Sequence, residues 1–231
     1  MNKYPLFLSL HAATIVVAGA GGVGRRKVES LLKAGPEEIR IVDPVLAHEK
    51  IRAEIAGTVP EGCATTLTFV AEPFTPEILR GAMLVFAATP SEDLNREIAG
   101  YCNKLGILCN RADSEEGSDF TVPAWVQSGP ISIAVSTGGT SPALARRLRE
   151  DIEDWLGPGY GRLARLLGRV RPCVLSLDLP QTENARIFRS LAYSQLLDHL
   201  ESGDLEGAAA ELRDILPALL HEKVEEVLHE L

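Results

Sequence analysis

One strand–loop–helix junction near the start of the chain constrains the fold more than any other feature. The apolar residues Ile15 to Ala18 run into residues 19–24, Gly-Ala-Gly-Gly-Val-Gly, and a helical stretch follows from Gly22 to Ala34. We call residues 19–24 the glycine loop. The loop matches the pattern G-x-G-x-x-G directly after a strand and at the opening of a helix, which is the context that gives the pattern meaning. The junction therefore predicts a dinucleotide-binding βαβ unit.

Each position of the glycine loop has an expected role. Gly19 permits a tight turn, Gly21 lets a pyrophosphate approach the backbone, and Gly24 lets the helix pack closely on the strand. The free N–H groups at the helix start, on Gly22 and Val23, are expected to hold the phosphates together with the positive end of the helix dipole. The alternative interpretation is a glycine-rich turn that serves packing alone.

An acidic residue follows at the spacing that nucleotide recognition requires. Asp43 ends the second expected strand, about 20 residues beyond Gly24, where a carboxylate accepts both ribose hydroxyls. A 2′-phosphate would be repelled there, so the sequence predicts NAD as cofactor and disfavours NADP. Thr89 ends a later strand and is expected on the nicotinamide side.

The first half of the chain alternates short apolar strands with helical stretches. The expected strands are residues 15–18, 39–42, 65–70, 83–88 and 107–109, and the expected helices are 22–34, 46–55 and a stretch from the N-cap Ser91 to about Leu105. Strands that are apolar throughout are typical of a parallel sheet covered on both faces. The predicted fold class is α/β, with a Rossmann-type sheet.

The pattern changes after Asn110. Two expected strands, 120–126 and 131–136, flank a turn and should pair antiparallel, and Ser141 then caps a long helix that begins at Pro142. Later helices are expected to break at residues 157–159, 171–172, 179–180 and 202–203. The predicted organisation is an NAD-binding domain at 1–112, a small strand–helix dimerisation region at 113–156 and a helical C-terminal domain at 157–231.

Composition narrows the function classes. With 23 basic and 32 acidic side chains the formal charge is −9, which argues against a nucleic-acid-binding protein. The four cysteines form no CxxC pair and indicate reduced thiols in the cytoplasm. An apolar stretch at 4–24 resembles a secretion signal, but polar residues and Pro5 interrupt it, so export is disfavoured. No segment reaches the 18 or more apolar residues of a membrane span, so no membrane association is expected.

A carboxylate follows the fifth expected strand. Cys109 to Asp113 ends that strand at the carboxyl edge, where open α/β sheets place ligands and catalytic groups. Asp113 is therefore a candidate catalytic residue beside the cofactor. Its other interpretation is an Asx-turn residue in the polar stretch 114–116. The residues alone leave both interpretations open.

The glycine loop followed by Ile41, Val42 and Asp43 also resembles the adenylating enzymes that activate the C-terminus of ubiquitin-like proteins. Those enzymes continue with an acidic residue and an Arg-Gln pair that contact ATP, and they usually carry paired zinc cysteines. This chain continues with residues 44–48, Pro-Val-Leu-Ala-His, and lacks CxxC. The adenylating function is therefore disfavoured.

A more specific resemblance extends over about residues 3 to 170. Its segments are 4–8 (Tyr-Pro-Leu-Phe-Leu), the glycine loop running into Arg25-Arg26-Lys27, 86–89 (Phe-Ala-Ala-Thr) with Asn95, Cys109-Asn110 with Asp113, Phe120 and Pro123, and 135–146. The last contains Thr-Gly-Gly-Thr-Ser-Pro at 137–142, which is far more specific than the glycine loop. Together these segments are similar to the precorrin-2 dehydrogenase family, which includes stand-alone enzymes and the N-terminal module of bacterial sirohaem synthase.

The resemblance implies oxidation of precorrin-2 to sirohydrochlorin with NAD as hydride acceptor, and in several members the insertion of ferrous iron as a second substrate. Asp113 matches the family's catalytic aspartate. The carboxylates of the tetrapyrrole require anchors, for which we expect Arg146, the helix start at Ser141 and the neighbouring Thr140, with Asn110 beside Asp113. No metal ligand is predicted, because none of the five histidines lies near Asp113 in the sequence.

The region from residue 120 to residue 155 has apolar surfaces that the chain itself does not cover. The strand pair at 120–136 cannot cover itself, and an apolar stripe of Leu144, Leu148, Ile152 and Trp155 needs a partner surface, so a homodimer is expected, as the resemblance also implies. The alternative is a module that senses NAD and needs no catalytic Asp113.

Overall fold

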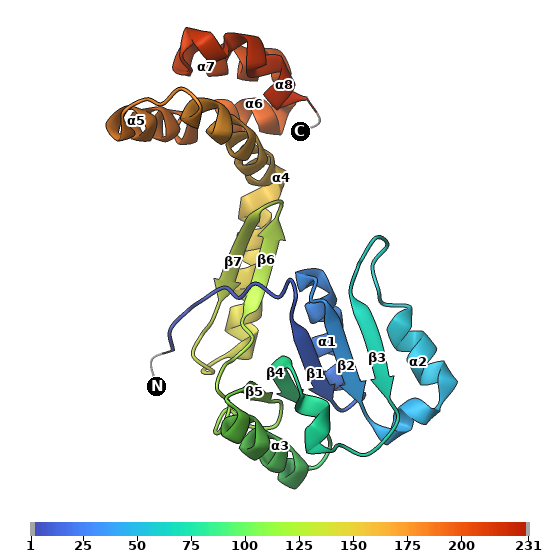
Figure 1. Ribbon diagram of the computed structural model, residues 1–231. Helices are drawn as coiled ribbons and strands as arrows, with labels where there is room; N and C mark the ends of the chain where they lie inside the picture. Colours follow the sequence, from blue (N-terminus) through green and yellow to red (C-terminus); the bar gives the residue numbers. More distant parts are fainter. Residues whose placement is uncertain (1–2, 230–231) are drawn as a thin grey trace. The chain divides into compact units, whose positions relative to one another are not determined.

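Five parallel strands carry the first half of the chain. They are β1 (Thr14–Ala18), β2 (Glu38–Val42), β3 (Thr66–Val70), β4 (Ala82–Ala87) and β5 (Leu108–Arg111), in the order β3-β2-β1-β4-β5 (Figure 1). The computed structural model describes residues 3–229, which form one unit at 3–122 and a second from residue 123 onward. The strand order reverses between β1 and β4, and ligands bind at such a switch point in open α/β sheets.

Helices cover both faces of this sheet. They are α1 (Gly22–Ala34), η1 (Pro44–Ala47), α2 (Glu49–Ala56), η2 (Pro76–Leu79) and α3 (Glu92–Leu105). Because side chains alternate along a strand, Ile15 and Val17 pack with α1 on one face, whereas Val16 and Ala18 pack with α3 on the other. The expected α/β class with a Rossmann-type sheet is confirmed.

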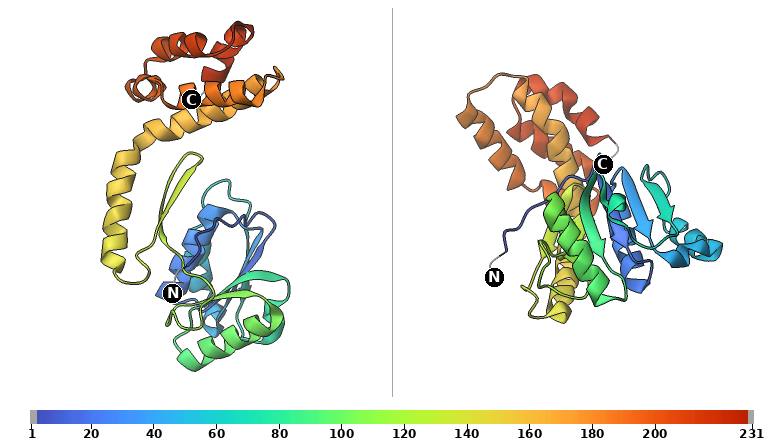
Figure 2. Two further views of the ribbon diagram at one scale, coloured as in Figure 1. Left: turned by 90° about the vertical axis from the view of Figure 1, so that its left-hand side faces the viewer. Right: turned by 60° about the horizontal axis from the view of Figure 1, so that its bottom comes forward.

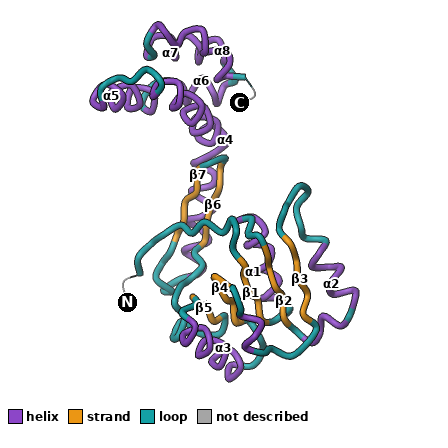
Figure 3. Tube along the Cα trace, in the orientation of Figure 1, coloured by secondary structure: helices purple, strands orange, loops and turns teal. Residues whose placement is uncertain are grey.

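The second unit begins with β6 (Ala124–Ser128) and β7 (Ile131–Val135), which pair antiparallel as expected. The expected bounds 120–126 of the first strand are wrong, because β6 starts at Ala124 and continues through Gln127 and Ser128, which pair with β7. Helices follow: α4 (Pro142–Leu175), α5 (Gln181–Ala192), α6 (Leu196–Ser202), α7 (Leu205–Ile215), η3 (Ala218–Lys223) and α8 (Val224–Leu228). The strand pair lies along the first half of α4 (Figure 3). The last helices gather around its second half and enclose their own apolar core (Figure 2).

Helix α4 differs from the sequence-based expectation at its two proline sites. The expected break at 157–159 is a kink inside one helical run, at Gly157 with φ 49° and ψ −167°. The expected break at 171–172 is wrong, because α4 continues through Pro172 to Leu175. A proline in a helix interior costs about 3 kcal/mol. Burial of Val170 and Val174, on either side of Pro172, stabilises by about 1.5–3 kcal/mol each, which offsets that cost.

No helix within residues 3–229 is long and apolar enough to cross a membrane.

The helical core predicts a stability effect. Leu166 is fully buried in α4, so Leu166→Ala should lower the free energy of unfolding of the second unit by about 2–5 kcal/mol. Leu175→Ala in the same helix is the control, because Leu175 is 44% exposed and should change stability by less than about 1 kcal/mol. Urea unfolding followed by circular dichroism measures both variants. Equal urea midpoints for the Leu166→Ala and Leu175→Ala variants would contradict the assignment of Leu166 to the core.

Candidate active site at the carboxyl edge of the sheet

The glycine loop is packed against the end of β4. Gly19 has φ 107°, and a Cβ atom there would collide with the backbone of Ala88. A Cβ atom on Gly24 would collide with the carbonyl oxygen of Gly19. At Gly21 and Gly22 an added Cβ would meet nothing within 4 Å. Packing therefore requires the first and last glycines of the motif, whereas the middle ones leave open space on the outer side of the loop.

The start of α1 offers hydrogen-bond donors to that open space. The first helical bond runs from Arg25 N to Gly21 O at 3.0 Å, and no side chain caps the helix. Acidic residues are absent from its first turn. The N–H groups of Gly22 and Val23 therefore have no acceptor in the helix and can bind an anion. This donor set fits the pyrophosphate of a dinucleotide.

Asp43 connects β2 to the glycine loop. One carboxylate oxygen accepts a hydrogen bond from Ala20 N at 2.8 Å, and the other accepts from Val45 N at 2.9 Å, which starts η1. A carboxylate has about four acceptor positions, so two bonds leave it able to accept ribose hydroxyls. Asp43 thus fixes the loop, a role that its spacing did not reveal, and its contact with ribose stays a prediction.

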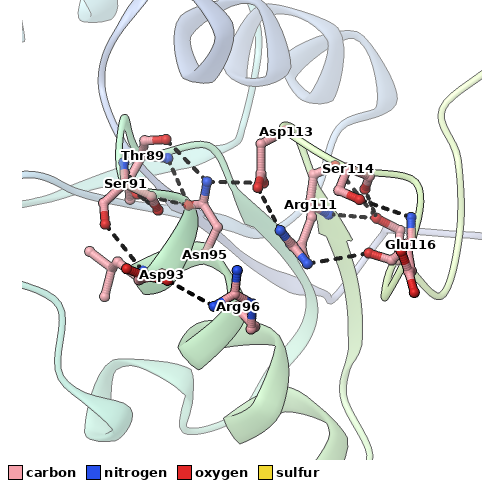
Figure 4. Close-up of polar contacts among 11 residues, drawn as sticks. Thr89, Ser91, Asp93, Asn95, Arg96, Arg111, Asp113, Ser114 and Glu116 are labelled. Atoms are coloured by element: carbon pink, nitrogen blue, oxygen red, sulfur yellow. Dashed lines mark hydrogen bonds and ion pairs between the residues drawn. The ribbon is translucent and has the colours of Figure 1, made fainter.

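Thr89 and Asn95 join the end of β4 to α3. Asn95 Oδ1 accepts from Thr89 N at 3.1 Å and from Thr89 Oγ1 at 2.7 Å, and Asn95 Nδ2 donates to Thr89 O at 3.1 Å (Figure 4). Ser91 caps α3, as expected, by accepting from Leu94 N. Because Thr89 follows Ala88, which lies against Gly19, this network borders the glycine loop.

Asp113 is held from two sides. Its Oδ1 accepts from Asn95 Nδ2 at 3.0 Å, and its Oδ2 forms an ion pair with Arg111 at 2.6 Å (Figure 4). The side chains of Asp113 and Arg111 are only 18% and 11% exposed. The hydrogen bond from Arg111 holds the pKa of Asp113 below its usual value, although desolvation opposes this effect. Asp113 is therefore an ionised carboxylate of low basicity.

A cleft of about 490 Å³ opens beside this carboxylate. It is lined by Glu92, Arg96, Arg111, Asp113, Ser114, Glu116 and Gly117. The cleft places cations and anions around one ionised group, so it offers charged partners to a polar ligand.

Asn110 lies on β5 next to this region. It is buried, and its Nδ2 donates to Phe120 O at 2.9 Å. The Phe120 ring meets Phe86 of β4 edge-on with 5.4 Å between centroids, and Lys27 Nζ lies 5.4 Å from the Phe86 ring centroid. Burial lowers the pKa of this Lys27 ammonium group.

The hydrogen bond from Asn110 Nδ2 to Phe120 O positions the loop that contains Phe120. A contact between Asn110 and the substrate stays a prediction.

Three predicted substrate contacts belong to the second unit. Thr140 Oγ1 donates to Thr137 O at 2.6 Å, and Ser141 caps α4 by accepting from Leu144 N at 3.2 Å. Arg146 pairs with Glu150 at 3.0 Å on an exposed surface, where such a pair contributes at most about 1 kcal/mol. Arg146 can therefore leave Glu150 and bind a substrate carboxylate with little loss of free energy.

Sequence reasoning assigned no role to Arg111 or to the Asn95–Asp113 contact. Arg111 had a local signal, because residues i and i+2 of an extended segment lie on one face and Asp113 follows it by two. Asn95 had none, since it reaches Asp113 from another element. Within residues 3–229, no group of three or more His, Cys, Asp or Glu side chains could hold a metal ion.

Comparisons with known proteins agree with this site. Residues 6–124 match a family described as putative NAD(P)-binding, and residues 128–154 match one described as sirohaem biosynthesis protein, central. Siroheme synthase 1 of Pectobacterium atrosepticum is 32% identical over 94% of this chain, and siroheme synthase of Gluconacetobacter diazotrophicus is 36% identical over 88%. The chain spans only 43% and 46% of the length of these two relatives.

A solved structure called SirC, precorrin-2 dehydrogenase, has the same fold. It superposes with a TM-score of 0.69, covering 97% of this chain and all of that one, at 21% identity. The expected resemblance to siroheme synthases is thus confirmed. The model described as putative NAD(P)-binding matches more than half of the sequence, and the glycine loop offers the backbone donors that a dinucleotide requires, so this chain belongs to that NAD(P)-binding family.

Proposed function

We propose that this chain catalyses the NAD-dependent oxidation of precorrin-2 to sirohydrochlorin. The observation that carries the proposal is the Thr89–Asn95–Asp113 chain of hydrogen bonds, which links an ionised carboxylate to the border of the glycine loop. The siroheme synthase relatives and the precorrin-2 dehydrogenase of like fold support the choice of substrate. The reaction consumes precorrin-2 and NAD⁺ and yields sirohydrochlorin, NADH and a proton.

The residues divide this work between binding and charge stabilisation. Gly21, Gly22 and Val23 present the backbone to the pyrophosphate, and Asp43 accepts the ribose hydroxyls, which favours NAD over NADP. NAD⁺, when bound, supplies the hydride acceptor. Thr89 lies on the nicotinamide side.

Asp113 stabilises the positive charge that develops on the tetrapyrrole as hydride leaves. An oxidised, cationic macrocycle loses a proton readily, so a carboxylate of low basicity suffices to receive it. Iron insertion requires a stronger base, because the pyrrole N–H groups of neutral sirohydrochlorin are weaker acids than the cationic macrocycle. Because the hydrogen bond from Arg111 lowers the basicity of Asp113, we do not extend the proposal to iron insertion.

Substrate anchoring and assembly belong to the same proposal. On the second unit, Arg146 and the helix start at Thr140 and Ser141 are the proposed anchors for tetrapyrrole carboxylates. On the first unit, Asn110 is a proposed substrate contact beside Asp113. Two copies associate through the second unit. All four cysteines are free thiols, which fits a reducing cytoplasm.

The central test replaces Asp113. Asp113→Ala should lower the rate of NADH formation from precorrin-2 and NAD⁺ by about 10²–10⁴-fold and leave NAD affinity unchanged. Asp93→Ala is the control, because Asp93 is exposed on α3. NADH absorbance is followed together with the sirohydrochlorin spectrum. Absence of turnover by folded, NAD-binding wild-type protein would instead favour the sensing module.

The glycine loop gives a second prediction. Gly21→Ala should weaken NAD binding at least about tenfold, because the new methyl group occupies the space intended for pyrophosphate, and should change stability by less than about 1 kcal/mol. Gly100→Ala is a matched control. A Cβ atom added at Gly100 also meets nothing within 4 Å, and Gly100 lies on α3, outside the glycine loop. Calorimetric titration with NAD and thermal unfolding measure both effects. Unchanged NAD affinity in Gly21→Ala would refute the assigned loop role.

The dimer gives a third prediction. Leu144, Leu148 and Trp155 on α4 are 48%, 38% and 62% exposed, a contiguous apolar face that a second copy would cover. Sedimentation should show a dimer at micromolar concentration, and Leu148→Asp should shift it to monomer. Leu219→Asp, at an 81% exposed position on η3, should leave the dimer intact. A monomeric wild-type protein would disprove this interface.

A further inference from the structure

Asn95 is a polar side chain buried in the helix beside the proposed site. It lies on α3 and is 1% exposed. In Figure 4 it lies between Thr89, at the end of β4, and Asp113, in the loop after β5. Burial of an amide costs free energy unless its polar atoms are paired. A core position on a helix is more simply filled by an apolar residue, so the contacts of Asn95 indicate what the amide is for.

Every polar atom of this amide is used. Nδ2 donates one hydrogen to Thr89 O and the other to Asp113 Oδ1, while Oδ1 accepts from both the amide and the hydroxyl of Thr89. A carboxamide offers two donor hydrogens and an acceptor oxygen together, so it can serve a carboxylate, a backbone carbonyl and a backbone N–H at once. A leucine could do neither, and an ionised aspartate could only accept.

We propose that Asn95 is a positioning residue, which holds the Asp113 carboxylate at a fixed place relative to the end of β4 and favours its ionised form. The inference rests on the proposed function and deepens it. It adds a second support to the one that Arg111 provides, from a different element. Two donors from α3 and β5 fix both carboxylate oxygens, so the orientation of Asp113 is determined as well as its charge.

Other charged groups also surround Asp113 and must be kept constant in a test. Glu92 and Arg96 lie on α3, Arg111 on β5 and Glu116 on the following loop. Of these four residues, Arg111 hydrogen-bonds to the Asp113 carboxylate through its side chain, as Asn95 also does. A change confined to Asn95 therefore leaves the remaining charges in place.

The decisive experiment replaces Asn95 by aspartate and titrates Asp113 directly. Carbon-13 NMR of carboxyl-labelled protein follows its ionisation, with the signal assigned by its loss in Asp113→Asn. In Asn95→Asp a second carboxylate replaces a donor, and like charges raise the pKa, so the midpoint of Asp113 should rise by about one pH unit or more. Asn103→Asp makes the same charge change on an exposed position of α3 and should leave the midpoint unchanged.

Kinetics provide the second measurement. The acid limb of kcat/KM for precorrin-2 oxidation should move to higher pH in Asn95→Asp and stay in place in Asn103→Asp. Asn95→Ser covers the case in which the aspartate variant does not fold. Its shorter hydroxyl cannot bridge Thr89 and Asp113, so kcat should fall about 10- to 100-fold while the circular dichroism spectrum is retained.

The outcomes separate this inference from the proposed function. An unchanged Asp113 midpoint in Asn95→Asp, or full kcat in folded Asn95→Ser, would overturn the positioning role. Failure of the wild-type protein to oxidise precorrin-2 would overturn the proposed function. The NMR titration still decides whether Asn95 controls the charge of Asp113 in that case, because it requires no turnover.

Discussion

The close approach of three backbone segments at Gly19 is the constraint on which the rest of the first unit depends. Gly19 directly follows β1, lies against the backbone at Ala88 after β4 and contacts Gly24 at the start of α1. No side chain fits between these segments. Their contact brings the end of β4 beside the glycine loop, and with it Thr89. The packing that closes the fold therefore also creates the ligand-binding edge of the sheet.

Polar side chains stabilise this edge where backbone contacts alone would leave it loose. Asp43 ties the glycine loop to β2, and Asn95 ties the end of β4 to Asp113. Both hydrogen bonds are partly buried, so breaking either one would leave a polar partner that water reaches only in part. These bonds fix the positions of the glycine loop and of Asp113, both of which lie outside the strands.

The Arg111–Asp113 pair determines what chemistry the carboxylate can perform. A nearby cation favours the charged form, so Asp113 resists protonation as the pH falls but accepts protons weakly. Such a group suits a reaction in which positive charge develops on the substrate. It suits less well a reaction that requires removal of weakly acidic protons.

The sequence by itself determined what short-range rules control. Helix α1 occupies the expected 22–34, the Ser91 and Ser141 caps stand where they were predicted, and the β-α order required a parallel sheet. The tertiary structure alone decided what depends on distant packing. The helix passes through Pro172 because its buried neighbours outweigh the proline's cost, and Asn95 reaches Asp113 because α3 packs beside β5. Periodicity records which face of an element is buried, but not which distant polar atom that face will meet.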